Sequence, residues 1–227
     1  MVYYDIHTHC PASNREDIAV ISIDMRNTQV FREDLPQDEG RYYSVGIHPW
    51  HIDDNDMTKV RNYATLSSVV AIGETGLDKM TAVTADDFIL QQELFVSHIH
   101  LSEEVRKPLI IHCVKAWDEL LHIRKAIKPS TPWVIHGFRG NKMLANQLLN
   151  AGLYLSFGNL HNIEALNTAW EKRQLLAETD DHNTNIRDVY KLLTKELSIS
   201  ENELSTGIGA FFDANIIKTR KRTNITI

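Results

Sequence analysis

A pair of histidines near the amino terminus has the spacing of a metal chelate. Residues 5–9 read Asp-Ile-His-Thr-His and overlap the end of the apolar run Val2–Ile6. In an extended chain, residues two apart point to the same side, so His7 and His9 can direct both imidazoles at one point. A metal ion held from a strand would use this geometry. Taken alone, the pair is nearly as well explained by an ordinary structural role.

The same spacing recurs at His98 and His100, where it predicts something different. This second pair falls inside Thr84–Arg106, a segment whose apolar residues recur with a helical period. Positions two apart on a helix do not face each other. We therefore interpret His98 and His100 as helix surface or partly buried side chains, and not as ligands.

Further polar residues directly follow apolar runs elsewhere in the chain. They are Glu74, His112, His136 and Asp180. If the runs are parallel strands of a barrel, their carboxyl ends meet on one face, where barrels build active sites. Burying so many polar groups together is costly unless something satisfies them, and a divalent metal would do so. Histidine nitrogen with carboxylate oxygen suits Zn²⁺, Mn²⁺ or Fe²⁺, and a more carboxylate-rich site would admit Mg²⁺.

Short apolar runs alternate with longer amphipathic stretches along the chain. Several runs are rich in β-branched residues, as buried parallel strands tend to be. The candidate strands are Val2–Ile6, Ile18–Ile23, Tyr42–Ile47, Val69–Ile72, Pro108–Ile111, Trp133–Ile135, Leu153–Phe157 and Gln174–Ala177. The candidate helices are Thr84–Arg106, Trp117–Ile127, Lys142–Asn150, Asn185–Leu197 and Glu201–Ile217. Strands that alternate with helices predict right-handed crossovers and a parallel sheet.

This pattern predicts an α/β fold, and the number of strands favours closure into a TIM-type (β/α) barrel. The stretch between His7 and Ile18 is short for a full crossover helix. We therefore expect a barrel that is distorted or that lacks its first crossover helix. An open doubly wound sheet is the alternative architecture. The length fits a single hydrolase barrel domain over residues 1–227, with a helical tail at its carboxyl end.

Composition narrows the classes of protein that fit. The net charge of −6 and the pI near 6.0 argue against nonspecific nucleic-acid binding through a broad basic surface. A bound metal could still supply positive charge to a phosphodiester. No apolar stretch approaches the roughly 20 residues that span a bilayer, and no signal peptide is evident. With two cysteines, no disulfide framework is expected, and we predict a cytoplasmic protein.

Taken in order, these segments resemble the TatD-like family of metal-dependent hydrolases, within the wider amidohydrolase-type barrels. The matching segments are Asp-Ile-His-Thr-His at 5–9, Val-Gly-Ile-His-Pro at 45–49, Ile-Gly-Glu-Thr-Gly-Leu-Asp at 72–78, Ile-Ile-His at 110–112, His-Gly-Phe-Arg-Gly at 136–140 and Glu-Thr-Asp at 178–180. Each segment is weak singly, but the ordered set is specific and extends across most of the chain. The resemblance implies a TIM-type barrel and one or two divalent metal ions (Zn, Mn or Mg). It also implies phosphoester hydrolysis, with DNA a substrate of several members.

The resemblance also assigns roles to the polar residues. The implied metal ligands are His7, His9, Glu74, His112, His136 and Asp180. His7 and His9 would bind one metal, and Glu74 would bridge or ligate. The second metal would be held by His112 and His136. Because Asp180 would orient or deprotonate the attacking water, Asp180 and Glu74 are the predicted catalytic residues.

Substrate contacts are predicted from residues beside these motifs. The predicted substrate-binding residues are His48, Lys115 and Arg139. His48 could equally be a loop histidine ordered by Pro49, and Lys115 could be a solvated start of the next helix. Trp50 could form an aromatic rim for bases or sugars, and a tryptophan that only covers the barrel mouth is an equally good interpretation.

The chain departs from the family pattern around the rim. Where the family often has an arginine after the fifth strand, this chain has Val114 followed by Lys115. After Asp180 the family usually continues with Ala-Pro-aromatic, and here residues 181–184 read Asp-His-Asn-Thr. After Asp78 the chain continues with Lys-Met and not with aromatic residues. The metal-binding residues are therefore retained, while the loops that would face a substrate differ.

We therefore predict a metal-dependent hydrolase that cleaves phosphodiester bonds with a metal-bound hydroxide, as a DNase does. The metal would lower the pKa of water from about 15.7 toward roughly 7. The partner would be a phosphoester substrate such as DNA ends or nucleotides, with no membrane and no obligate protein partner. One alternative is an amidohydrolase acting on a C–N or ester bond. The other is a noncatalytic relative that keeps the metal for folding or partner binding.

Overall fold

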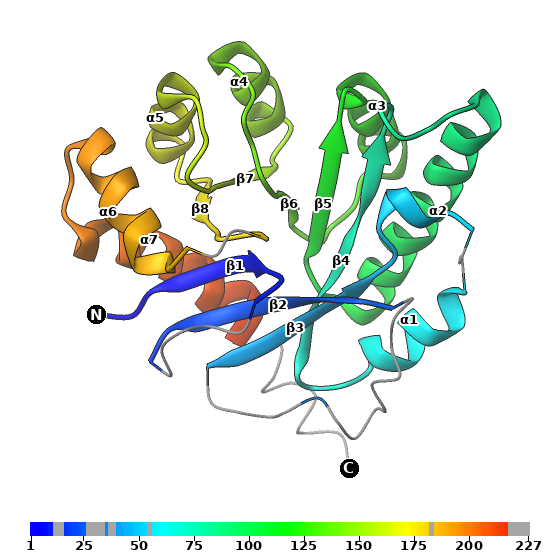
Figure 1. Ribbon diagram of the computed structural model, residues 1–227, viewed down its shortest axis with the longest axis horizontal. Helices are drawn as coiled ribbons and strands as arrows, with labels where there is room; N and C mark the ends of the chain where they lie inside the picture. Colours follow the sequence, from blue (N-terminus) through cyan, green and yellow to red (C-terminus); the bar gives the residue numbers. More distant parts are fainter. Residues whose placement is uncertain (11–15, 26–34, 36–39, 54–55, 182–183, 218–227) are drawn as a thin grey trace.

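The computed structural model describes residues 1–10, 16–25, 35, 40–53, 56–181 and 184–217. Its centre is one sheet of eight parallel strands whose order in space follows their order in the chain (Figure 1). The strands are β1 (Tyr4–Thr8), β2 (Ile18–Asp24), β3 (Arg41–Gly46), β4 (Val69–Asp78), β5 (Leu109–Val114), β6 (Trp133–Ile135), β7 (Tyr154–Phe157) and β8 (Leu175–Ala177). Every predicted strand is present; β6 has the predicted bounds, and the ends of the other strands differ from the prediction.

The sheet closes on itself between its first and last strands. Thr8 and Asp180 form a parallel bridge just beyond β8. The backbone N–H of His9 donates to the carbonyl of Asp180 over 3.0 Å, and the N–H of Asp180 donates to the carbonyl of His7 over 3.0 Å. This closure confirms the predicted barrel and excludes the open doubly wound sheet. It also brings the first and last predicted ligand segments together.

Helices cover the outside of the barrel (Figure 1). They are α1 (Met57–Ala64), α2 (Ala85–Val105), α3 (Trp117–Ile127), α4 (Lys142–Asn150), α5 (Ile163–Glu171), α6 (Ile186–Leu197) and α7 (Glu201–Phe212), with short turns η2 (Pro49–His51) and η3 (Asp213–Ile217). The predicted bounds of α3 and α4 agree with the structure. Helices α1 and α5 were not predicted; they are short and begin at Asp56 and Asn162 caps.

The predictions for the first crossover and for the carboxyl-terminal helices have different outcomes. Residues 11–15, where a reduced or absent first crossover helix was predicted, lie outside the described residues. At the other end, α6 and α7 contain most of the predicted helical tail. They pack against β8, and α7 also packs against β1. Among the described residues, no helix is both long and apolar enough to cross a bilayer.

Strand β4 is longer and less regular than the sequence suggested. It continues past the predicted end at Ile72, and its pairing with β5 shifts register between Ile72 and Thr75. Gly73 and Gly76 have φ values of 132° and 145°, which side chains of L-residues rarely adopt. A Cβ at Gly76 would also overlap the backbone oxygen of His112. Glycine is therefore required where β4 passes close to β5, and Glu74 lies between the two glycines.

The helical histidine His98 is fully buried, which corrects the prediction of a surface or partly buried side chain. Its Nε2 accepts the backbone N–H of Ile47 over 3.1 Å, and its Nδ1 lies 2.8 Å from the carbonyl of Leu94. These bonds require the neutral tautomer with the proton on Nδ1. His98 therefore joins α2 to the loop after β3, immediately before His48.

Acidification is expected to destabilise the protein through His98. Burial lowers its pKa from 6.5 to about 4, although the bond to Leu94 opposes that shift. Between these pH values the unfolded chain binds the proton and the folded chain does not, so the stabilisation present above pH 6.5 is lost as pH falls toward 4. The loss is about 3 kcal/mol at about 1.4 kcal/mol per pKa unit.

The measurement is urea unfolding of the wild type and of His98→Gln at several pH values. Other groups, including Asp5, titrate in this range, so the informative quantity is the difference between the two proteins. We expect the wild type to have the larger free energy of unfolding at pH 7.5, and we expect this difference from the variant to shrink as pH falls to 4.5. A difference that stays constant with pH would contradict the assignment of a neutral, buried His98.

Candidate metal centre

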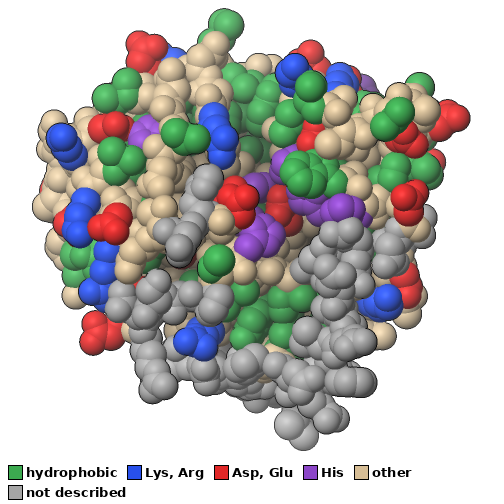
Figure 2. All heavy atoms as spheres, viewed as in Figure 1, with side chains coloured by type: hydrophobic (Ala, Val, Ile, Leu, Met, Phe, Trp, Pro, Cys, Tyr) green, Lys and Arg blue, Asp and Glu red, His purple; other side chains and the backbone are tan. Residues whose placement is uncertain are grey.

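All six predicted ligand residues converge at the carboxyl ends of the strands. His7 and His112 lie in β1 and β5, and His9, His136 and Asp180 follow β1, β6 and β8. Glu74 lies inside β4, and not just beyond the fourth strand as the sequence analysis placed it. Five of the six, together with His48, line a cavity of about 270 Å³, and His7 lies buried against them. Figure 2 shows histidine side chains beside acidic ones near the centre of the face in view.

The two carboxylate oxygens of Glu74 face two different sets of histidines. Oε2 lies 3.4 Å from His7 Nε2 and 3.3 Å from His9 Nε2. Oε1 lies 2.7 Å from His136 Nε2 and 3.2 Å from His112 Nδ1. Because the glutamate side chain is only 7% exposed, it can serve both sets without competition from bulk water. Glu74 therefore lies between two groups of nitrogen donors.

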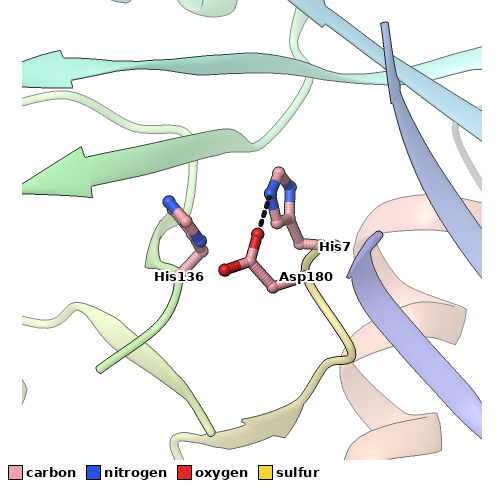
Figure 3. Close-up of side chains that lie close together, drawn as sticks. All are labelled: His7, His136 and Asp180. Atoms are coloured by element: carbon pink, nitrogen blue, oxygen red, sulfur yellow. Dashed lines mark ion pairs between the residues drawn. The ribbon is translucent and has the colours of Figure 1, made fainter. Parts of the chain in front are cut away.

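The first set of donors is completed by Asp180. Its Oδ1 lies 3.5 Å from His7 Nε2 and 3.7 Å from His9 Nε2. Figure 3 shows the His7 imidazole directed at the Asp180 carboxylate, with His136 on the other side of that carboxylate. The donor atoms of His7, His9 and Glu74 all lie within 4.8 Å of one another, and so do those of His7, His136 and Asp180. Either group could hold a metal ion.

The second set contains a histidine that the sequence analysis assigned to substrate. His48 Nε2 lies 3.0 Å from Glu74 Oε1, and its ring centroid is 4.5 Å from that of His112. The donor atoms of His48, Glu74 and His112 form another group within 4.8 Å. His48 therefore faces the same oxygen of Glu74 as His112 and His136 do. Its predicted contact with substrate stays a prediction.

Several buried nitrogen atoms in this cluster have no hydrogen-bond partner. Among the described residues, both ring nitrogens of His7 and Nδ1 of His136 are buried without one. His7 Nε2 is close to two carboxylates but lacks hydrogen-bond geometry to either. Unsatisfied buried polar atoms are costly. Imidazole nitrogens that face shared carboxylates are the donor set of a divalent cation bound by histidine and carboxylate ligands.

The carboxylates and imidazoles strongly perturb each other's pKa values. Burial would raise the pKa of Glu74, but His136 and the other histidines hold it well below its usual value. Burial and His136 lower the pKa of His7, yet Asp180 and Glu74 raise it overall to about 9. Burial would raise the pKa of Asp180, but His7 and His136 together lower it to about 2. Protons and a metal ion compete for these lone pairs, so cation binding would release protons.

Two carboxylates that were not predicted as site residues contact the outer side of the ligand histidines. Asp78 Oδ2 lies 3.2 Å from His112 Nε2, and Glu178 Oε1 lies 3.6 Å from His136 Nδ1. A carboxylate behind a ligand histidine fixes which nitrogen keeps its proton and which faces the metal. Both residues lie inside the motifs already recognised, and Asp78 has the even spacing from Glu74 that could have indicated it.

The other predicted substrate residues lie farther from the cluster. Arg139 is exposed and lines a small cavity that is also bordered by Asp180. Lys115 is exposed, has φ of 54°, and does not line the cavity of the histidine cluster.

The cysteine beside His112 is not activated. Burial raises the pKa of the Cys113 thiol to about 12, which makes it a poor nucleophile.

The comparison with protein families agrees with this geometry. A sequence model of the family described as TatD related DNase matches residues 5–199, from the first histidine segment to just past the end of α6. The matched region begins at Asp5 and contains every predicted ligand.

Individual relatives are similar over part of their length. The uncharacterized metal-dependent hydrolase YcfH of Escherichia coli K12 is 36% identical over 146 residues, which cover 61% of this chain and 54% of that protein. The 3′-5′ ssDNA/RNA exonuclease TatD of Yersinia pseudotuberculosis is 30% identical over 60% of this chain and 56% of that protein. The alignments thus span about half the length of these relatives.

A solved structure supports the fold independently of close sequence similarity. The crystal structure of YjjV, a TatD homologue from Escherichia coli K12, superposes with a TM-score of 0.78. It covers 92% of this chain and 96% of that chain at 19% sequence identity. At this identity the likeness establishes the shared barrel.

Proposed function

This chain belongs to the TatD related DNase family, and we propose that it is a divalent-metal-dependent phosphodiesterase acting on nucleic acid or nucleotides. The observation that carries the proposal is the position of Glu74 between two sets of histidine donors. A relative named as an exonuclease for single-stranded DNA and RNA supports a phosphodiester as the substrate class.

The residues of the cluster divide into two metal positions around Glu74. His7, His9 and Asp180 would hold one ion with Oε2 of Glu74. The other position would be formed by His112 and His136 with Oε1 of Glu74, and Asp78 would fix the tautomer of His112. Divalent metals bound here supply Lewis acids that acidify water and stabilise charge developing on a phosphoryl group.

The protein's own groups perform the remaining steps. Asp180 has a low pKa, so at neutral pH it is an ionised carboxylate at the cavity wall. It would orient a water molecule toward the scissile phosphorus and accept its proton. His48 lines one cavity with Asp180, and Arg139 lines a second, smaller cavity that Asp180 also borders. Both side chains would contact phosphoryl oxygens. Arg139 is the charged group suited to phosphate, because a guanidinium donates to two oxygens at once.

Metal binding is the first prediction of this proposal. We expect protein purified without chelator to contain one or two divalent metals per chain, measured by ICP-MS. Removing the metal with EDTA should lower the melting temperature, and restoring it should raise the temperature again, because a ligand of the native state stabilises by mass action. An unchanged melting temperature with no metal after reconstitution with Zn²⁺, Mn²⁺ or Mg²⁺ would contradict the proposal.

The bond that is cleaved is tested with two chromogenic substrates. The reconstituted protein should hydrolyse bis(p-nitrophenyl) phosphate and leave p-nitroacetanilide intact. Hydrolysis of the anilide alone would support the amidohydrolase alternative. A metal-loaded protein that cleaves neither substrate, nor a single-stranded oligonucleotide, would support the noncatalytic alternative.

A further inference from the structure

An exposed tryptophan is held rigidly beside the histidine cluster. Trp50, in η2, is 55% exposed and lines the same cavity as Glu74. Its ring centroid lies 4.8 Å from that of His48 and 5.9 Å from that of His112. More than half of the Trp50 side chain is therefore exposed to water, and its ring lies beside His112, a proposed metal ligand. Figure 2 shows hydrophobic side chains bordering the histidines on this face.

A buried carboxylate fixes the orientation of this ring. Trp50 Nε1 donates to Asp78 Oδ2 over 2.7 Å, and the Asp78 side chain is 3% exposed. The same oxygen lies 3.2 Å from His112 Nε2. One carboxylate thus positions both a ligand histidine and the exposed indole.

A second buried side chain holds the backbone on both sides of this contact. Gln91 of α2 is 1% exposed, and its Nε2 donates to the carbonyls of Pro49 and Asp78, each over 3.1 Å. Its Oε1 accepts the N–H of Asp78 over 2.8 Å. The loop that carries Trp50 and the end of β4 are therefore tied to one helix. An aromatic ring that is already ordered loses little conformational entropy when a ligand binds.

We infer that Trp50 forms a stacking subsite for an unpaired nucleobase of the substrate, next to the scissile phosphate. This inference rests on the phosphodiesterase proposed above and assigns the residue that binds a base of its substrate. Base–aromatic stacking is tolerant of sequence because every base has a π face. A base inside a duplex is stacked on its neighbours and cannot reach the ring, so the subsite favours single strands and frayed ends.

The test compares two fluorescein-labelled oligonucleotides, both assayed with Mn²⁺. One carries thymine on every sugar, and the other has abasic tetrahydrofuran units at the residues nearest the cleaved end. Bis(p-nitrophenyl) phosphate is unsuitable here, because its aromatic rings could stack on Trp50 as well. In the wild type, KM for the thymine oligonucleotide should be about tenfold lower than for the abasic one.

In Trp50→Ala the two KM values should converge, while Trp50→Phe should keep part of the difference because it keeps an aromatic ring. Met143→Ala is the matched control, since Met143 is 77% exposed but does not line the cavity. Equal KM values in the wild type, or an unchanged ratio in Trp50→Ala, would overturn the subsite and leave the phosphodiesterase standing. Cleavage of neither oligonucleotide by the wild type would overturn both.

Discussion

Replacing Glu74 by glutamine is expected to abolish both metal binding and turnover. Glutamine has nearly the shape of glutamate, but its amide carries no charge, and only one of its two polar atoms can act as a ligand. The two donor sets would then lose the carboxylate that joins them. Removing a single preorganised hydrogen-bond donor from an active site already costs about 10²–10³ in kcat. We expect a loss of about 10³-fold or more, with metal content near zero.

A second consequence of Glu74→Gln does not depend on activity. Burial lowers the pKa of His136, and Glu74 is the first group that raises it again, to well above its usual value. Without the carboxylate, the pKa values of His136 and His7 should both fall. Titration of the imidazole C–H resonances by NMR measures this directly in EDTA. Glu93→Gln, on the exposed face of α2, is the control that should change neither property. Metal content and turnover like those of the wild type in Glu74→Gln would exclude the two-position site.

The sequence predicted the barrel because its evidence is local and repeated. Each apolar run is one buried strand, and the polar residue that follows it marks the carboxyl end of that strand. A parallel barrel needs only this order to bring the ends together, so His7 and Asp180 could be placed on one face although they lie far apart in the chain. The bridge between Thr8 and Asp180 is the contact that brings the two segments together in the structure.

The position of Glu74 could not be predicted from alternation alone. The register shift in β4 and the positive φ values of Gly73 and Gly76 break the regular pleat around it. Such irregularities depend on the neighbouring strand, since a side chain at Gly76 would overlap the backbone of His112. Strand periodicity carries no information about this contact, which exists only in the folded barrel.

The outer groups of the site were missed for a related reason. Asp78, Glu178 and His98 act on other residues, and the contacts that define their roles are seen only in the folded structure. A helical histidine that accepts the N–H of Ile47 and lies against the carbonyl of Leu94 has no signature in the sequence. The same holds for Trp50, since an exposed ring and an ordered subsite look identical until the bond to Asp78 is seen.

Replacing Asp180 by asparagine is expected to lower kcat by about 10³-fold while most of the metal is retained. Asparagine keeps an oxygen that can face His7 but cannot accept a proton, and general acid–base groups contribute about 10²–10⁴. Asparagine is also the substitution that the backbone tolerates, because Asp180 has φ of 55° and asparagine adopts this region more readily than alanine does. Any loss in Asp180→Asn can then be assigned to the carboxylate and not to strain.

The measurement combines kcat with metal content and melting temperature for Asp180→Asn and for Asp118→Asn, an exposed aspartate of α3 that serves as the control. Together with Glu74→Gln, it separates the roles of two carboxylates that both face His7 Nε2, with Glu74 Oε2 at 3.4 Å and Asp180 Oδ1 at 3.5 Å. Glu74 faces both sets of histidine donors, so its replacement should remove metal and activity together. Asp180 is one of several ligands at a single position, so its replacement should lower activity far more than metal content. If Asp180→Asn keeps its metal and its kcat, the proton acceptor is another group at the cavity. If it loses the metal as completely as Glu74→Gln does, Asp180 is a ligand first, and its role toward water follows from holding the ion.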